Sequence, residues 1–341
     1  MSARRLYLDA CPGEVRAVVT LDGLPERLFI ERSGVDLGPA LGARYRARIA
    51  EIAGDLRLAR LDLGQSLQGV LPMKPGAGLA RGATVEVEVD AEARGGKAAG
   101  VRLIGPGEGR PELLAPAPDV RVRLAAAAPE AEVILGEGAR EAADEAEAAA
   151  LAIHHALPGG VSLSIESTRA LVAVDVDRAG TAGASVKAVL EANRTAIGQA
   201  ARLLRLKALG GTIVIDLIGF PRDGSLLQAE ARTAFAPDQP GVSVLPVSRL
   251  GLLQLAKPHR ERPAVERLCD VDGRLSARSI AQRLVRALER EGRADPGAQL
   301  IARCAPEAAA ELRPLAAALG PRFGVTEELG WDRLKSDISG R

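Results

Sequence analysis

The sequence is poor in aromatic residues, which make up 2% of its 341 residues. A nucleic-acid surface on such a chain would have few rings on which to stack bases and would rely more on arginine. Lysine is also scarce, with six lysines among the 45 basic residues. The arginine excess, beside so much alanine, is what codon bias in a GC-rich genome produces, so it does not by itself indicate a binding surface.

Cysteine and long apolar runs are scarce too. The three cysteines, Cys11, Cys269 and Cys304, are far apart, which argues against a disulfide framework and for a reducing compartment. No segment approaches 18 consecutive apolar residues, and the N-terminus lacks the apolar stretch of a signal peptide. We therefore expect a cytoplasmic protein that does not use the membrane as a partner.

The net charge of +1 gives no global basic surface. Residues 159–262 carry 13 Lys and Arg against 9 Asp and Glu, a balance of +4, whereas residues 112–150 carry 3 against 9, a balance of −6. This asymmetry fits a nucleic-acid site that is confined to one face of the molecule.

The length predicts two or three domains, and the composition is that of a globular protein. Five short alternating runs separated by Gly-containing turns predict a small OB-type barrel. We expect an α+β multidomain protein with N-terminal strands in 1–35, the barrel in 36–104, a linker in 105–118, an α/β catalytic domain in 119–262 and a small α/β C-terminal region in 263–341. The barrel runs are Tyr45–Ala53, Arg57–Leu63, Gln68–Pro72, Thr84–Asp90 and Ala98–Leu103.

An acidic helix, Glu137–Leu157, precedes a strand–helix–strand pattern, which predicts two parallel strands joined by a helical crossover. The pattern comprises Ala170–Asp177, Ser185–Leu209 and Thr212–Ile218, followed by a helix at Ser225–Phe235 and a third strand at Gly241–Val247.

Two aspartates stand in those apolar strands, Asp175 in the first and Asp216 in the second. Such apolar runs predict strands that are covered on both faces, where an ionised carboxylate needs a compensating partner such as a cation. Parallel neighbours lie about 4.8 Å apart, so both carboxylates could share one Mg²⁺, and Asp177 faces the same side as Asp175. The alternative is that these residues cap helices or pair with arginine at strand ends.

The predicted long helix, Ser185–Leu209, also contains polar residues that could bear on function. Asn193 falls inside its apolar stripe and is either a satisfied core amide or a group aimed at the carboxylates. Arg202 and Arg205, on another side, are expected to face phosphate or solvent.

The histidines carry less information. His154 and His155 are interpreted as capping or solvating the end of the acidic helix, and His259 as part of a solvated basic loop. Gly159-Gly160 and Gly210-Gly211 each precede a strand and not a helix, so we interpret them as turns and not as phosphate-binding loops.

Several strings of this sequence resemble the ribonuclease E/G family, and two more resemble the family's S1 RNA-binding domain. The first group is Gly159-Gly160, Ile165–Val176, Leu204–Asp216 and Val247–Leu253, and the second is Leu79–Gly82 and Glu92–Ala99.

This resemblance implies a Mg²⁺-dependent endoribonuclease that cuts single-stranded RNA in rRNA or mRNA processing. Asp175 and Asp216 take the place of the family's metal-binding aspartates, and Asn193 matches an asparagine of its long helix. Mg²⁺ would hold the scissile phosphate and activate water, roles that need no histidine. We therefore expect Asp175, Asp216 and Asn193 to be catalytic, with Asp177 as a further metal ligand.

The sequence also departs from the family pattern. Asp177 replaces the usual asparagine, and Arg60 and Val70 replace two aromatic residues that contact RNA in the S1 domain. Arginine can still stack on a base, whereas valine stacks poorly. The expected RNA contacts are Arg60, Lys74 and Lys97 in the barrel and Arg202, Arg205 and Arg249 in the α/β domain.

Only Cys269 remains where the family's zinc link joins protomers, so we expect no zinc site, and a homodimer would use other surfaces. The segment 111–158 is too short for the domain that senses a 5′ monophosphate. The alternative function is a degenerate member that binds RNA without cutting it, which Asp177, Arg60 and Val70 favour. A metal-dependent α/β enzyme with another substrate is a more distant alternative.

Overall fold

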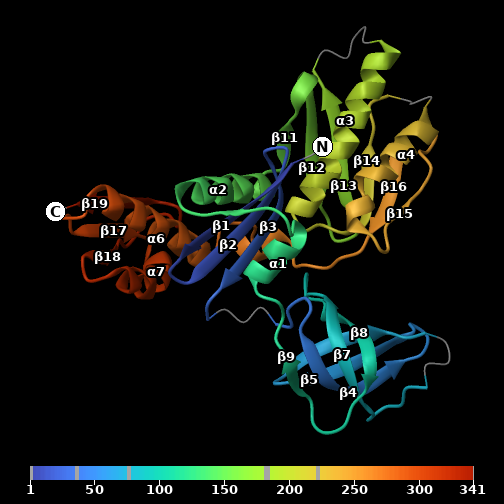
Figure 1. Ribbon diagram of the computed structural model, residues 1–341, viewed down its shortest axis with the longest axis horizontal. Helices are drawn as coiled ribbons and strands as arrows, with labels where there is room; N and C mark the ends of the chain where they lie inside the picture. Colours follow the sequence, from blue (N-terminus) through green and yellow to red (C-terminus); the bar gives the residue numbers. More distant parts are fainter. Residues whose placement is uncertain (1–2, 35–37, 75–77, 180–184, 220–222, 341) are drawn as a thin grey trace.

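The computed structural model describes residues 3–34, 38–74, 78–179, 185–219 and 223–340, so the expected boundary between residues 35 and 36 lies outside the described residues. An N-terminal sheet occupies the centre, with an α/β unit, a barrel and a C-terminal unit around it (Figure 1). No helix in the described ranges is long and apolar enough to cross a membrane.

The expected N-terminal strands form an antiparallel meander, to which a later strand adds in parallel. That strand and a short helix come from residues 120–134, which we had assigned to the catalytic domain. The elements are β1 (Arg4–Cys11), β2 (Glu14–Leu21), β3 (Leu24–Arg32), α1 (Val120–Ala127) and β10 (Val133–Ile134).

The barrel is a closed sheet with the strand order β4-β5-β6-β8-β7 returning to β4, which is consistent with an OB-type fold. Its interior is filled by alternate residues such as Ala47, Leu61 and Val87. The expected linker is partly wrong, because residues within it add a further strand to β4. The strands are β4 (Arg44–Ala53), β5 (Leu58–Gly64), β6 (Leu67–Pro72), β7 (Thr84–Ala91), β8 (Ala99–Pro106) and β9 (Glu112–Ala115).

The α/β unit has the strand order β11-β12-β13-β14-β16-β15. The expected parallel pair is confirmed, because β13 and β14 run parallel and are connected through α3. The elements are α2 (Glu137–Leu151), β11 (His154–Ala156), η1 (Pro158–Gly160), β12 (Val161–Ser167), β13 (Val172–Arg178), α3 (Val186–Leu206), β14 (Gly211–Asp216), α4 (Gly224–Ala234), η2 (Ala236–Asp238), β15 (Ser243–Val244) and β16 (Leu252–Lys257).

The prediction of a third strand at Gly241–Val247 is wrong in extent. Only Ser243–Val244 form a strand there, at the sheet edge, and β16 is the strand that pairs with β14. Prolines 240 and 246 flank the short strand, and proline has no N–H to donate to a ladder.

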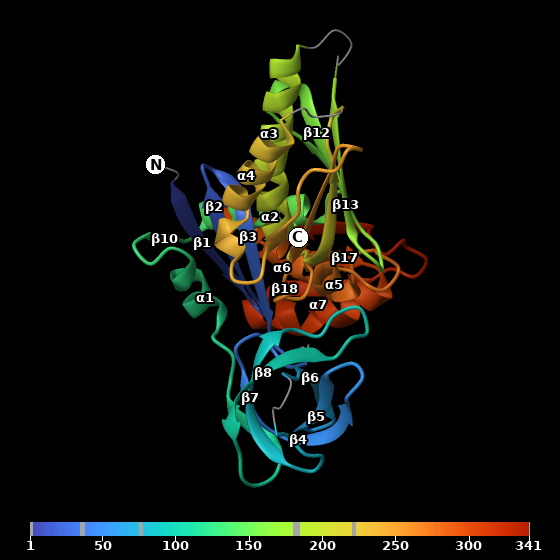
Figure 2. The ribbon, with the colours of Figure 1, turned by 90° about the vertical axis from the view of Figure 1, so that its right-hand side faces the viewer.

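Among the described residues, helices cover one face of this sheet and leave the other uncovered, as Figure 2 shows for α3 and α4. Along β13, Val172, Val174 and Val176 are buried, whereas the residues between them are exposed. Our expectation of a sheet covered on both faces is therefore wrong. The uncovered side is called the open face below.

The C-terminal unit packs two helices against a three-stranded sheet. It is joined to the N-terminal sheet by buried ion pairs of Arg286, with Asp9 at 3.0 Å and with Glu14. Within the N-terminal sheet, Asp9 also pairs with Arg16 at 2.7 Å. Although burial opposes ionisation, these arginines and Arg140 hold the pKa of Asp9 below its usual value. The elements from the connecting helix onward are α5 (Ala264–Leu268), α6 (Ala277–Ala294), β17 (Leu300–Cys304), α7 (Pro306–Leu319), β18 (Phe323–Glu327) and β19 (Ser336–Gly340).

Candidate active site

A pair of aspartates lies on the open face at the carboxyl ends of the two parallel strands. Asp175 on β13 is directly opposite Asp216 on β14, and both residues are exposed. Since neighbouring strands lie about 4.8 Å apart and residues in register share a face, the two carboxylates start from adjacent positions. The structure thus brings together the two residues that we expected to be closest to the chemistry.

The same row continues across the sheet to its edge. Ser164 on β12 is opposite Asp175, and His154 on β11 is opposite Ser164. The Nδ1 of His154 lies 2.9 Å from the Oγ of Ser164. We call His154, Ser164, Asp175 and Asp216 the polar row.

Sequence reasoning missed the first two members of the polar row. The helix that we expected to reach residue 157 ends at Leu151, so His154 does not cap it and lies instead on an edge strand. The alternation of Ser162, Ser164 and Glu166 between apolar residues was the signal that could have identified β12 and its open face.

Asp177 does not join the aspartate pair. It stands two residues further along β13, a rise of roughly 6.6 Å, and its Oδ1 accepts the N–H of Arg178 at 2.6 Å. Within the described ranges, no group of three or more Asp, Glu, His or Cys is placed to hold a metal ion. The expected ligand set of Asp175, Asp177 and Asp216 therefore reduces to the pair.

Asn193 lies on the opposite side of the sheet and is fully buried. Its Nδ2 donates to the carbonyl oxygen of Ile218 at 3.2 Å, and its Oδ1 accepts the N–H of Ile218 at 2.9 Å. It is therefore the satisfied core amide of our two alternatives and not a catalytic residue. Its position is still informative, because it holds the chain two residues beyond Asp216.

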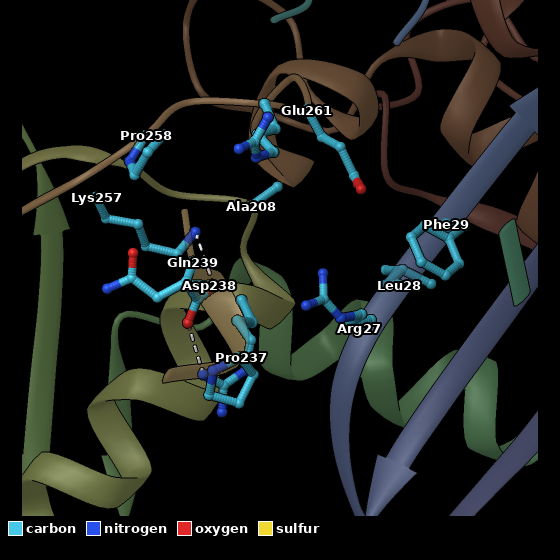
Figure 3. Close-up of a pocket in the computed structure, with 12 residues that line it drawn as sticks. Arg27, Leu28, Phe29, Ala208, Pro237, Asp238, Gln239, Lys257, Pro258 and Glu261 are labelled. Atoms are coloured by element: carbon cyan, nitrogen blue, oxygen red, sulfur yellow. Dashed lines mark hydrogen bonds and ion pairs between the residues drawn. The ribbon is translucent and has the colours of Figure 1, made fainter. Parts of the chain in front are cut away.

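Arg202 and Arg205 are buried, which corrects our expectation that they face phosphate or solvent. Arg205 pairs with Glu26 at 3.0 Å and with Asp238 at 2.8 Å. Asp238 also pairs with Lys257 at 3.4 Å (Figure 3). The reason is tertiary: β3 of the N-terminal sheet packs on this side of α3 and supplies Glu26.

The other expected RNA contacts are exposed. Arg249 lies in the turn before β16, at the Asp216 end of the sheet, because β16 begins opposite Asp216. In the barrel, Lys74 and Lys97 are exposed, and the Arg60 side chain is 71% exposed with a 3.5 Å contact to Glu51.

The barrel docks at the other end of β14. Glu92 of the barrel accepts the N–H of Arg262 at 2.8 Å and also pairs with Arg267. This docking brings Lys97 close enough to His259 to contribute to lowering the pKa of that histidine. Lys97 and Asp216 therefore lie toward opposite ends of β14.

His259 is part of this junction and not of a solvated loop. It packs on Gly211, whose φ of +91° and whose missing Cβ, which would stand 2.8 Å from the His259 Nε2, both require glycine. Burial, followed by Arg94, Lys257 and Lys97, lowers the pKa of His259 to about 4. The imidazole is therefore neutral near pH 7.

Comparison with known proteins places the polar row in a recognised sequence segment. Residues 139–260 match the model of the Ribonuclease E/G family. The chain is 36% identical over 134 residues to a chloroplastic ribonuclease E/G-like protein of Arabidopsis thaliana, covering 36% of this chain and 13% of that protein. It is 36% identical over 105 residues to ribonuclease E of Escherichia coli (strain K12), covering 30% of this chain and 10% of that protein.

Ribonuclease E of Haemophilus influenzae gives a similar match, 36% identity over 105 residues, with 30% of this chain and 11% of that protein covered. The matched regions are thus only 10% to 13% of the length of these relatives. All four members of the polar row lie in the segment that matches the family model. Residues 139–260 of this chain are thus similar to the ribonuclease E/G family.

Proposed function

We propose that this chain is an endoribonuclease that hydrolyses phosphodiester bonds in single-stranded RNA, with Mg²⁺ held by Asp175 and Asp216. The observation that carries the proposal is the in-register aspartate pair on an exposed sheet face, within the segment that matches the family model. The relatives that are named ribonuclease E support the class of reaction.

The aspartate pair fits Mg²⁺ in its donor chemistry. Mg²⁺ is commonly held by one or two carboxylates and keeps its remaining positions for water and substrate phosphate. Because Asp175 and Asp216 are exposed, phosphate and water can approach them from solvent. When bound, the ion supplies charge stabilisation for the phosphate and activates a water molecule.

The protein's own contribution is to position the ligands. Asp175 and Asp216 are held in register by the parallel ladder of β13 and β14. Asn193 fixes the chain directly after Asp216, through its two hydrogen bonds to Ile218. Such support from buried side chains is what keeps a metal site in its working geometry.

The open face offers a path for RNA between the barrel and the aspartate pair. The length of β14 separates its barrel end from Asp216, roughly 16 Å at the usual rise per residue. OB-type barrels hold single strands, so Arg60, Lys74 and Lys97 would bind the RNA upstream or downstream of the cut. Arg249 would contact a phosphate close to Asp216.

Substitution of the pair tests this proposal. Asp175→Asn and Asp216→Asn should each lower the Mg²⁺-dependent cleavage rate of an A/U-rich RNA by more than about 100-fold, because a neutral amide is a poor ligand for a hard cation. Their affinity for the RNA should stay within about threefold of wild type, since the barrel contacts are unchanged. Thr233→Ala, exposed on α4 and away from the open face, is the control. A variant of the pair that keeps more than a tenth of the rate would refute the site.

RNA binding without cleavage is the second candidate function. Asp177 is exposed on the same face as the pair and adds negative charge where a phosphate would lie. In that case the wild-type chain would bind the RNA with the same affinity in Mg²⁺ as in EDTA, and the RNA would stay intact in both.

A further inference from the structure

We propose that His154, oriented by Ser164, binds the RNA phosphate next to the scissile one. This inference rests on the proposed function, because it takes the aspartate pair as the place of cleavage. It concerns His154 and Ser164, the two members of the polar row outside the aspartate pair. They occupy positions on β11 and β12 that match the position of Asp175 on β13.

The spacing of the row determines which phosphate His154 can reach. Two strand spacings, about 10 Å, separate the backbone of His154 from that of Asp175. The imidazole is therefore too far away to hold the group that lies between Asp175 and Asp216. The imidazole lies within reach of the next phosphate of an RNA strand that runs from the aspartate pair across β12 towards the sheet edge.

The hydrogen bond to Ser164 makes His154 a suitable donor. When the Ser164 hydroxyl donates to Nδ1, the neutral ring carries its proton on Nε2, and this N–H can donate to a phosphate oxygen. The ring is exposed, and Nε2 has no partner in the part of the chain that the structure describes. Ser164 thus fixes the ring orientation, and with its hydroxyl as the donor it also sets the tautomer that phosphate binding requires.

Electrostatics gives a reason for a donor at this place. The open face near the cut carries the carboxylates of Asp175, Asp177 and Asp216, which repel every phosphate that is not bound to a cation. An RNA strand that continues past the aspartate pair therefore needs a contact that compensates this repulsion. His154 is the nearest donor along the row, because Ser164 is engaged with it.

A double-mutant cycle between the protein and the RNA tests the contact without requiring cleavage. The affinity of wild type and of His154→Ala is measured in EDTA, by fluorescence anisotropy, for a short A/U-rich RNA and for a series in which each phosphate in turn is a neutral methylphosphonate. His154→Ala should weaken binding of the unmodified RNA by about fivefold. Neutralising one particular phosphate should weaken wild type by a similar factor, and the two changes together should cost no more than either alone.

Ser164→Ala serves as the intermediate case and Thr233→Ala as the control. Ser164→Ala should weaken binding by about twofold and depend on the same phosphate, because the ring remains but loses its orientation. Thr233 is exposed on α4, away from the open face, so Thr233→Ala should bind as wild type does. The proposal is wrong if His154→Ala binds the RNA as tightly as wild type. It is also wrong if the affinity lost in His154→Ala adds to the affinity lost on neutralising each phosphate, whichever phosphate is neutralised.

The same experiment separates this inference from the proposed function. If wild type does not cleave RNA in Mg²⁺ but the cycle identifies one coupled phosphate, the proposed function fails and the contact stands. If wild type cleaves and no phosphate is coupled to His154, the proposed function stands and the contact fails.

Discussion

Asn193 supports the geometry of the aspartate pair from the buried side of the sheet, through its two hydrogen bonds to Ile218. Replacing it with alanine leaves the N–H and the carbonyl of Ile218 without their partner on the buried side of the sheet. Unsatisfied buried groups of this kind cost about 1–3 kcal/mol each. Asn193→Ala should therefore lower the unfolding free energy by a few kcal/mol, measured by urea titration with circular dichroism.

The same variant should also slow cleavage more than it weakens RNA binding. Asp216 is two residues from Ile218, so a shift of this segment would displace one of the two carboxylates. We expect kcat to fall by about tenfold or more, with a small change in KM. Wild-type kcat in a folded Asn193→Ala protein would contradict the positioning role.

Single residues were predictable from the sequence where local periodicity determines their environment. Asp175 and Asp216 belong to this class, because period-2 alternation and a parallel crossover place them together without knowledge of distant segments. Arg205 does not, because its partner Glu26 is 179 positions away in the sequence. An arginine on an amphipathic helix has the same pattern whether it faces solvent or a buried carboxylate.

Among the elements, β11 and the segment after β16 make the fold sensitive to acid. The pKa of His259 is lowered to about 4 by burial and neighbouring cations, and that of His155 to about 4 by burial and Lys207. In the unfolded chain both would titrate near pH 6.5. Because the unfolded state binds the protons more readily, stability is fully present above about pH 6.5 and is lost as the pH falls towards 4.

We therefore expect the urea midpoint to fall between pH 7 and pH 5, and His259→Gln to reduce that fall because glutamine does not titrate. Carboxyl groups with a lowered pKa, such as Glu14 and Glu26, lose their contribution at still lower pH and do not confuse this window. An equal pH dependence of the midpoint in wild type and His259→Gln would show that His259 is not responsible.

At the scale of elements, the sequence predicted the barrel strands and the crossover unit, whose patterns are long and regular. It did not predict β11 or β16. A three-residue strand such as His154–Ala156 has too few positions to show a period, and β16 is apolar enough to be ambiguous by itself. The open face was missed for a related reason. Ala173 and Val214 are apolar, so the sequence suggests burial at these positions, although no helix covers them.

For the molecule as a whole, the acidic segment 112–150 bears on whether the proposed cleavage depends on a phosphate at the 5′ end of the RNA. Its three arginines do not converge on a phosphate pocket: Arg140 is buried with Asp9 and Glu289, and Arg123 pairs with Glu261 at 2.8 Å. Arg121 is exposed and is the only one of the three without a partner in the described part of the chain. A terminal phosphate would need several such donors together.

We therefore expect cleavage that does not depend on the 5′ end of the RNA. One RNA is prepared with a 5′ monophosphate and with a 5′ hydroxyl, and initial rates are compared at limiting substrate. The ratio should be close to one. A preference for the monophosphate of more than about tenfold, equivalent to roughly 1.4 kcal/mol, would reveal a sensor elsewhere on the molecule.

The central claim is that Asp175 and Asp216 form a metal-dependent site for RNA hydrolysis, and one assay addresses it directly. Purified wild type and Asp216→Asn are incubated with an A/U-rich single-stranded RNA, each in Mg²⁺ and in EDTA. We predict cleavage by wild type in Mg²⁺ alone, its return when Mg²⁺ is added back after EDTA, and intact RNA with Asp216→Asn. Intact RNA with wild type in Mg²⁺, or equal cleavage by the variant or in EDTA, would contradict the claim.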